Sequence, residues 1–415
     1  MPNTHPLARP YRLHNQVQTY DWGTRDAEAY IPQLLGTPAE PGVPYAELWL
    51  GAHPKAPSQL ELPDGTQTAL DAWIAANPIA ALGNEVFDRF GGLPFLLKVL
   101  SAGEALSIQA HPTKAQAEVL HAQDPAHYPD DNHKPEIAIA LDGLAALMGL
   151  KPFPDLVATL DRYPEIANFV GEAVVARVTA PAPTAGEAVL ARELFSALIV
   201  NAAADPVALA SAVDAMAERL ASQGAALAEA EQRFLDLRHQ YGSGDVGLLA
   251  LFLFNLAHLE PGEGLYTTAG VPHAYLRGNI IECMANSDNV VRVGLTPKFK
   301  DARTLLEIMD TTPQTPAPLD GAPVTDGEGV TRWVYATPAA EFEMRRWQLP
   351  RGTGATVEKG EVPTVLLVVE GAVMLSWAGG ETTYRKGQSA FVPACLHTYT
   401  LHATSDADLF QAAVP

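Results

Sequence analysis

The sequence contains few cysteines, no long hydrophobic run and comparatively little positive charge. Its two cysteines, Cys283 and Cys395, are too few for a disulfide framework, and there is no Cys-x-x-Cys pair for zinc or redox chemistry. The longest apolar stretch, around Leu248 to Phe254, is far shorter than the roughly 20 residues that span a bilayer. The first residues, MPNTHPLARPYRL, lack the apolar core of a signal peptide. We therefore expect a cytoplasmic protein that has no membrane partner.

The charge balance narrows the range of partners further. The 415 residues include 27 Lys and Arg against 48 Asp and Glu, which gives a formal net charge of −21. A surface this acidic repels nucleic acids, whose phosphates are bound mainly through clustered basic residues. The sequence also lacks a Walker-type loop and a Rossmann glycine motif, so nucleotide binding is not indicated. At roughly 100–200 residues per domain, the length predicts two to four globular domains.

The distribution of residue types predicts a mainly β protein with an α-helical insertion. Between Tyr20 and Leu150, Gly, Pro, Asn and Asp separate short apolar runs such as LPFLLKVL (93–100), which favours short strands joined by loops. From Lys151 to about Glu260, Ala, Leu and Glu dominate and apolar residues recur at helical spacing. Asp205 followed by Pro206 is typical of a helix start. One face of the helix before it is expected to hold Val189, Leu190, Leu194, Leu198 and Ile199.

After the helical block, the sequence returns to β-type patterns. The segment TLLEIMD (304–310) predicts a short helix before a Pro-rich linker, and runs such as TVLLVVEG (364–371) and HTYTLHA (397–403) predict further strands. We therefore expect a β domain formed by residues 1–150 and 259–325, with a helical domain at residues 151–258 inserted into it. A second, C-terminal β domain is expected at residues 326–415.

Four residues in the β-type segments have the chemistry of a divalent-metal site. Gln109 and His111 lie two residues apart, so their side chains share a face in a strand. Glu136 opens an apolar run, and His273 follows a proline. Two imidazoles, one carboxylate and one amide oxygen suit Zn²⁺ and are acceptable to other divalent ions. Alternatively, the histidines are surface or hydrogen-bonding residues and residues 133–136 form a solvated turn, because two-residue spacings are nonspecific.

A second group of polar residues indicates a phosphorylated ligand. The segment GNIIECMANSDNVVRVGLTPKFKD (278–301) contains Glu282, Asp288, Arg292 and Lys298. Together with Lys98 and Lys134, these cations concentrate positive charge near the candidate metal ligands of an acidic protein, as a small phosphorylated substrate requires. The alternative is a polar loop in which Arg292 forms a structural ion pair with Asp288 or Glu282.

Long ordered motifs resemble those of the type I phosphomannose isomerases, zinc enzymes of the cupin superfamily. They are YDWGT (20–24), AELWLGAHPKAPS (46–58), LPFLLKVLSA (93–102), LSIQAHP (106–112), NHKPE (132–136) and PHAYLRGNIIECMANSDNVVRVGLTPK (272–298). The resemblance implies a catalytic cupin domain of the β jelly-roll type, interrupted by a helical domain and followed by a cupin-like domain without metal.

The resemblance also implies roles for individual residues. One zinc ion per chain would be held by Gln109, His111, Glu136 and His273. Arg292 matches the active-site arginine of the family. Other pocket positions fall on Trp22, Lys98, Ser107, Lys134, Tyr275, Glu282 and Lys298.

The implied reaction interconverts mannose 6-phosphate and fructose 6-phosphate by proton transfer through an enediol, and it feeds mannose and GDP-mannose metabolism. It requires a base beside the carbon and positive charge beside the oxygens. Glu282 is the candidate base, with a metal-bound water or a neighbour of the metal ligands as the alternatives, and zinc, Arg292 and Lys134 are the candidates for the positive charge. Ser107 and Lys98 are expected to hold the phosphate, with help from Lys298 or Arg292. The alternatives are an isomerase for another phosphorylated sugar and a noncatalytic sugar-phosphate sensor.

Two further expectations concern the pocket and the assembly. Arg277 and Asn279 depart from the residues expected after HAYL, which puts the local shape of the pocket in question. We expect the protein to be a monomer.

Overall fold

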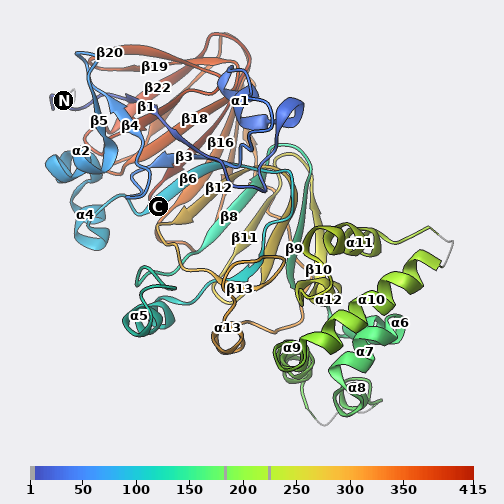
Figure 1. The fold of residues 1–415 in the computed structure, drawn as a ribbon. Helices are drawn as coiled ribbons and strands as arrows, with labels where there is room; N and C mark the ends of the chain where they lie inside the picture. Colours follow the sequence, from blue (N-terminus) through green and yellow to red (C-terminus); the bar gives the residue numbers. More distant parts are fainter. Residues whose placement is uncertain (1–4, 182–184, 223–225) are drawn as a thin grey trace.

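The computed structural model describes residues 5–181, 185–222 and 226–415. Within this part of the chain, antiparallel strands form three sheets, and the longer helices gather at one end of the molecule, at the lower right of Figure 1. The fold is therefore mixed, with antiparallel sheets and a central helical insertion, as the distribution of residue types predicts.

A ten-stranded sheet of the described residues is built around one long strand, β12 (His273–Ala285). This strand pairs with β6 (Phe95–Ala102), β8 (Glu136–Ala140) and β9 (Leu144–Leu150), and its first residue pairs with β7 (Ile108–Ala110). β6 also pairs with β3 (Glu47–Gly51). The other strands of this sheet are β2 (Gln16–Gln18), β10 (Phe254–Leu259), β11 (Gly264–Thr267) and β13 (Val291–Gly294).

A second sheet joins the two ends of the chain. In the order β14-β15-β16-β23-β18-β21-β1-β4-β5, strands from residues 11–69 lie beside strands from residues 324–413, and Tyr11 pairs with Phe391. This sheet combines strands of the predicted first domain with strands of the predicted C-terminal domain. The domain boundary at residue 326 therefore stays a prediction. The strands are β1 (Tyr11–His14), β4 (Gln59–Glu61), β5 (Gln67–Ala69), β14 (Val324–Thr325), β15 (Thr331–Tyr335), β16 (Glu343–Leu349), β18 (Thr364–Glu370), β21 (Ser389–Val392) and β23 (Ala407–Ala413).

The sheets are stacked in three layers, since the central one buries both of its faces. Leu367 of β18 packs in the same hydrophobic cluster as Leu97 of β6. The preceding residue, Leu366, points to the opposite face and packs with Val373 of the four-stranded sheet. That sheet has the order β17-β22-β19-β20 and consists of β17 (Gly354–Glu358), β19 (Ala372–Trp377), β20 (Gly380–Arg385) and β22 (Thr398–Ala403). The C-terminal strands predicted from the sequence are thus confirmed.

The helical insertion begins directly after β9 and ends before β10. Its helices are α6 (Phe153–Arg162), α7 (Pro164–Val170), α8 (Glu172–Val178), α9 (Glu187–Ala204), α10 (Pro206–Ser222), α11 (Glu229–Tyr241) and α12 (Gly247–Ala250). Asp205 caps α10 as predicted, because its Oδ1 accepts a hydrogen bond from the N–H of Ala208 at 2.9 Å. Four of the five residues predicted on the apolar face of α9 are buried, namely Leu190, Leu194, Leu198 and Ile199. Val189 is 57 % exposed, so the prediction that Val189 lies on this face is wrong.

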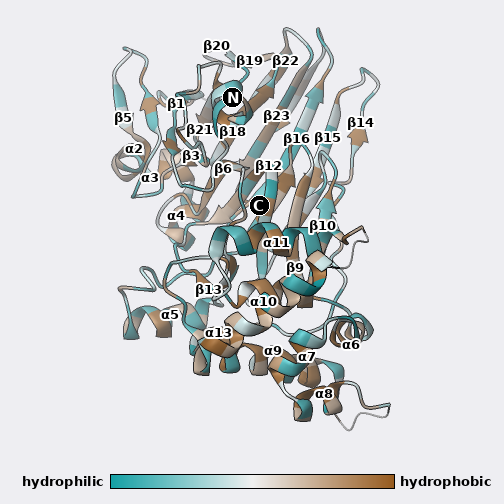
Figure 2. Ribbon diagram, turned by 45° about the vertical axis from the view of Figure 1, so that its right-hand side comes forward, coloured by the Kyte–Doolittle hydropathy of each residue, from teal (hydrophilic) through white to brown (hydrophobic). Residues whose placement is uncertain are grey.

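Hydrophobic residues, brown in Figure 2, follow the strands and the packed helices. No single helix of the described residues is long and apolar enough to cross a membrane; α9 and α10 meet that test only as a pair, with a bend of 114° between them.

The predicted short helix near residue 304 is α13 (Ala302–Ile308). The sequence did not predict the short helices between the early strands, namely α1 (Tyr30–Leu35), α2 (Leu70–Ala76), α3 (Pro78–Leu82), α4 (Asn84–Phe90) and α5 (Lys114–Gln123).

Candidate active site

Alternation along the strands of the ten-stranded sheet directs polar side chains away from its hydrophobic core. Lys98 lies between the core residues Leu97 and Val99 of β6 and points to the opposite face. Glu282 of β12 lies directly opposite Lys98 in the strand register. Glu136, the first residue of β8, pairs with the same strand two residues further along. One face of the sheet therefore collects charged residues although the strands themselves are buried.

His111, Glu136 and His273 bring three ligand atoms together. These atoms lie within 4.8 Å of one another. Glu136 Oε2 is 3.4 Å from His111 Nε2 and 3.2 Å from His273 Nε2. All three side chains are buried, and the three atoms have no hydrogen-bond partner in the described parts of the chain. Buried polar atoms that face one another without a hydrogen bond are unfavourable unless a cation lies between them.

The neighbouring groups orient these atoms for metal binding. His111 Nδ1 lies 2.8 Å from the carbonyl oxygen of Asn289, and His273 Nδ1 lies 3.0 Å from that of Val271. A carbonyl oxygen only accepts hydrogen bonds, so each Nδ1–H donates and each Nε2 keeps its lone pair. Burial lowers the pKa of His111 to about 4 against the opposing charge of Glu136, which keeps the imidazole neutral near pH 7.

Lys134 holds the other oxygen of the carboxylate. Its Nζ lies 2.8 Å from Glu136 Oε1, so Oε2 remains available on the side of the histidines. Burial acts to raise the pKa of Glu136, but the positive charge of Lys134 holds it well below its usual value. Both Lys134 and Glu136 are buried, which contradicts the solvated-turn alternative for this segment.

The residues present fit a zinc ion. Neutral imidazole nitrogens and a carboxylate oxygen are its usual ligands in proteins, and here the three atoms converge and have no hydrogen-bond partner among the residues that the structure describes. Gln109 of β7 pairs with His273 in the strand register, which puts its backbone next to the site.

A cavity of about 1260 Å³ lies beside the three ligands. His111 and His273 are fully buried, whereas the other predicted site residues line this cavity. They are Trp22, Lys98, Ser107, Gln109, Lys134, Glu136, Tyr275, Glu282, Arg292 and Lys298. Residues predicted from five separate sequence motifs therefore line the same cavity.

Lys98 lies between two buried carboxylates in the wall of the cavity. Its Nζ is 3.4 Å from Glu47 Oε2 and 3.1 Å from Glu282 Oε2. Burial acts to lower the pKa of Lys98, but Glu47 and Glu282 raise it above its usual value. Burial raises the pKa of Glu282, with Lys98 opposing and Glu136 adding to the shift. Burial also raises the pKa of Tyr275 well above its usual value, and so do the charges of Glu282 and Glu136, so its hydroxyl stays protonated.

Arg292 of β13 faces the cavity with its charge unpaired. Within the described residues it forms no ion pair, and burial lowers the pKa of its guanidinium. Asp288 pairs instead with Lys55 at 2.7 Å, and Glu282 pairs with Lys98. The alternative of a structural ion pair between Arg292 and either carboxylate is therefore wrong.

Several cavity residues were not assigned from the sequence. Glu47 and Trp49 come from β3, and the Nε1–H of Trp49 donates to Glu47 Oε2 at 2.5 Å. Tyr20 stacks on Trp22 with ring centroids 5.9 Å apart, and Lys298 Nζ lies 5.8 Å from the Tyr20 centroid. The alternation in AELWLG was the available signal, because it puts Glu47 and Trp49 on the face opposite the buried leucines.

The two departures from the family pattern lie away from these side chains. Arg277 is exposed, and its Nη2 lies 2.9 Å from Glu28 Oε2. Asn279 accepts a hydrogen bond from Ser101 at 2.6 Å and donates to Asp142. Both side chains therefore have local partners outside the cavity lining.

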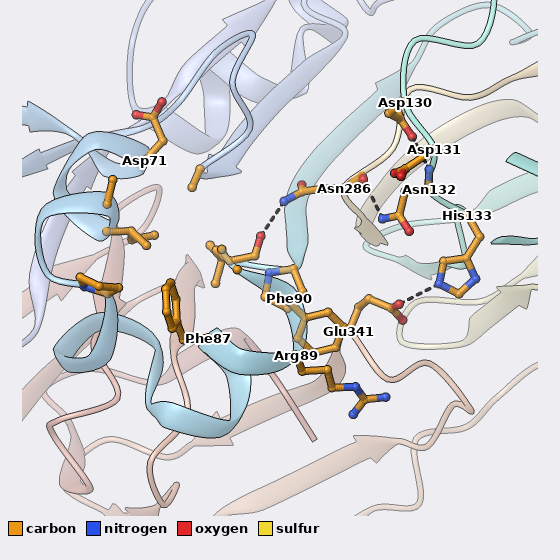
Figure 3. A pocket seen from close by; sticks show the side chains of 18 of the residues that line it. Asp71, Phe87, Arg89, Phe90, Asp130, Asp131, Asn132, His133, Asn286 and Glu341 are labelled. Carbon is orange, nitrogen blue, oxygen red and sulfur yellow. Dashed lines mark hydrogen bonds and ion pairs between the residues drawn. The ribbon is translucent and has the colours of Figure 1, made fainter. Parts of the chain in front are cut away.

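A second cavity of about 970 Å³ is shown in Figure 3, between the α2–α4 region and the segment that holds Asp130 to His133. His133 Nε2 points toward Glu341 Oε1 at 2.7 Å (Figure 3). The next residue, Lys134, lines the first cavity. The segment thus separates the two cavities, and consecutive side chains face different ones.

Comparisons with known proteins agree with this geometry. The family described as "Phosphomannose isomerase type I, catalytic domain" matches residues 11–153. Mannose-6-phosphate isomerase 2 of Arabidopsis thaliana is 38 % identical over 96 % of this chain and 92 % of its own length, and the Rattus norvegicus mannose-6-phosphate isomerase is 37 % identical over 93 % and 94 %.

Solved structures are similar over the same extent. A zinc-bound mannose 6-phosphate isomerase is 31 % identical with a TM-score of 0.82, covering 97 % of this chain and 98 % of that chain. An arginine-to-alanine mutant of phosphomannose isomerase from Salmonella typhimurium is 30 % identical with a TM-score of 0.81 and the same coverage. Since these similarities extend over nearly the whole of every chain compared, the protein belongs to the type I phosphomannose isomerase family.

Proposed function

We propose that this chain interconverts D-mannose 6-phosphate and D-fructose 6-phosphate. The observation that carries the proposal is one cavity that lies beside a buried His–Glu–His group and is lined by the buried carboxylate of Glu282 and by Arg292, which has no ion-pair partner among the described residues. Relatives named mannose-6-phosphate isomerase, at 37–38 % identity over most of this chain, support the same substrate pair.

One zinc ion per chain is proposed to bind His111, Glu136 and His273, with the amide oxygen of Gln109 as the fourth protein ligand. When bound, zinc supplies positive charge that polarises the substrate oxygens. The chain itself prepares the site, because Lys134 fixes one oxygen of Glu136 and two backbone carbonyls fix the imidazole rings.

Glu282 is the proposed base. In the forward direction it takes the proton from C2 of the open-chain aldose, so that the C1 carbonyl oxygen becomes the enediol oxygen. The protonated carboxyl then returns the proton to C1, and the proton of the C2 hydroxyl passes to the C1 oxygen as the ketone forms. A raised pKa suits both halves of this cycle, because the carboxyl must accept and then release the proton. Lys98 holds this carboxylate at 3.1 Å and thereby orients it.

Positive charge close to the substrate has two proposed uses. Arg292 and Lys134 stabilise the negative charge that develops on the substrate oxygens, as preorganised donors do in a site shielded from water. Ser107, Lys98 and Lys298 are assigned to the phosphate, with Trp22 and Tyr275 as further walls of the substrate site. Because Lys98 already contacts two carboxylates, the exposed Lys298 is the freer of the two cations to meet a dianion.

The experiment is a coupled assay that compares mannose 6-phosphate with free mannose and with other aldose phosphates. We expect turnover of mannose 6-phosphate, very poor turnover of mannose, and loss of turnover in Glu282→Gln at unchanged metal content. Equal efficiency on mannose would contradict the phosphate site, since phosphate binding energy should be realised partly in the transition state. Preference for another aldose phosphate would favour the alternative isomerase, and binding without turnover would favour the sensor.

The organisation of the chain is proposed as well. Residues 1–150 and 259–325 would form the catalytic cupin domain, residues 151–258 the helical domain, and residues 326–415 the metal-free cupin-like domain. The protein is proposed to be a monomer in the cytoplasm, and its two cysteines, both free in the structure, are consistent with a reducing compartment.

A further inference from the structure

The segment from Gly294 to Lys300 forms one side of the active cavity. Leu295, Thr296, Lys298 and Lys300 line the cavity, and the segment directly follows Arg292 on β13. Leu295 has φ +56°, a left-handed backbone conformation that a leucine adopts only when its surroundings impose it. Something must therefore hold this segment in place.

Asp245 makes the contacts that hold it. This residue follows α11 at the end of the helical insertion and is 5 % exposed. Its Oδ1 accepts hydrogen bonds from the backbone N–H of Gly247 and of Leu295, both at 2.8 Å. Its Oδ2 accepts one from Lys300 Nζ at 3.1 Å and a longer one from Thr296 N–H at 3.4 Å. One buried carboxylate thus binds the strained residue and the residues after it.

Two glycines allow the backbone to approach Asp245 this closely. A Cβ on Gly294 would collide with Asp245 Oδ1, and a Cβ on Gly247 would lie 2.8 Å from the backbone nitrogen of Leu295. Both positions therefore need glycine for the two chain segments to approach so closely. The same end of the helical insertion also touches the other flank of the cavity, where Tyr241 Oη donates to the carbonyl oxygen of Ala105 at 3.3 Å.

We propose that Asp245 is a positioning residue through which the helical insertion fixes the cavity wall from Gly294 to Lys300 and, with it, the place of Lys298. The inference rests on the proposed function, in which Lys298 meets the substrate phosphate. Asp245 acts through other residues: its oxygens are used by backbone amides and by Lys300, and Lys298 N–H in turn donates to Thr296 Oγ1 at 3.1 Å. The helical insertion is then part of substrate recognition although none of the proposed metal ligands comes from it.

The test is a double-mutant cycle between Asp245→Ala and Lys298→Met, measured as kcat/KM for mannose 6-phosphate well below the melting temperature. We expect Asp245→Ala to lower kcat/KM about tenfold, mainly through KM, at unchanged zinc content. Lys298→Met should be harmful in the parent but should add less than about threefold to Asp245→Ala, since the lysine is already misplaced. Asp245→Asn should recover part of the loss, because its amide oxygen still accepts from Gly247 and Leu295.

Asp214→Ala is the matched control, because this carboxylate also lies in the helical insertion and also binds a basic side chain, Arg238, at 2.7 Å. It should leave kcat/KM unchanged. Fully additive effects of Asp245→Ala and Lys298→Met would overturn the proposal, and so would a lower melting temperature with intact kcat/KM.

Hydrogen exchange gives a readout that does not depend on the substrate. The backbone amide of Leu295 should exchange at least tenfold faster in Asp245→Ala than in the parent or in Asp214→Ala. If the parent fails to isomerise mannose 6-phosphate, the proposed function fails, and the exchange at Leu295 still decides whether Asp245 holds the wall. Unchanged exchange would refute the positioning role whatever the substrate.

Discussion

Arg292→Lys offers the sharpest test of how the cavity stabilises charge. The substitution keeps the positive charge but removes the planar fork that presents several donors at once. Within the described residues Arg292 forms no ion pair, so its replacement leaves no buried carboxylate without a partner. The free energy of unfolding should therefore change by less than about 0.5–1 kcal/mol. Loss of one preorganised donor typically lowers kcat by about 10²–10³, which corresponds to roughly 2.7–4 kcal/mol of transition-state stabilisation.

The assay is the steady-state rate on mannose 6-phosphate, together with zinc content and melting temperature. Arg277→Lys is the matched control, because Arg277 is an exposed arginine that pairs with Glu28 outside the cavity. We expect a sharp fall in kcat for Arg292→Lys, with KM, zinc content and melting temperature close to the parent, and no effect for the control. Near-normal turnover of Arg292→Lys would refute the role of the guanidinium. Lost zinc or a lowered melting temperature would show that the arginine supports the fold instead.

Two further predictions concern the metal and a buried lysine. Loss of an outer hydrogen-bond partner of a metal ligand weakens metal binding roughly 10–100-fold, and His273→Ala should weaken zinc binding by more than that. Elemental analysis should find full zinc in the control His258→Ala, which changes an exposed histidine. Full zinc in His273→Ala as well would exclude His273 as a ligand. Burial lowers the pKa of Lys359 to about 7, so the unfolded chain binds its proton more readily and stability rises with pH between about 7 and the ordinary value near 10.5. Lys359→Met should therefore raise the free energy of unfolding by about 1 kcal/mol or more at pH 7, and the gain measured by denaturant unfolding should shrink toward pH 10; a gain that does not vary with pH would contradict this origin.

Local patterns predicted much of the fold and most of the site. The helical block, the cap at Asp205 and the C-terminal strands follow from periodicity and turn residues, and the structure has them where the sequence puts them. The ligands His111, Glu136 and His273 were found because long motifs fix their identity better than spacing does. Such signals are local, since each depends on residues that are close in the chain.

What the sequence did not predict depends on contacts between distant segments. Glu47 was missed because its partner Lys98 lies on the neighbouring strand, and nothing in AELWLG alone says which strand that is. Val189 was misplaced because apolar residues on α9 extend beyond the buried face, and burial depends on which helices pack against it. Asp245 gave no signal, because its hydrogen bonds reach residues about fifty positions away.

The pairing of the first strand with the last part of the chain has a consequence for synthesis on the ribosome. Tyr11 of β1 pairs with Phe391 of β21, so nearly the whole chain must emerge before this strand finds its place. β4 can pair with one edge of β1 early, but at about 5–20 residues per second the edge that meets β21 waits for tens of seconds with its backbone groups unpaired. The nascent N-terminal part therefore exposes an open strand edge for most of translation, which invites pairing with other chains. The nine-stranded sheet is therefore completed late in folding, and its completion buries N-terminal residues that were synthesised first.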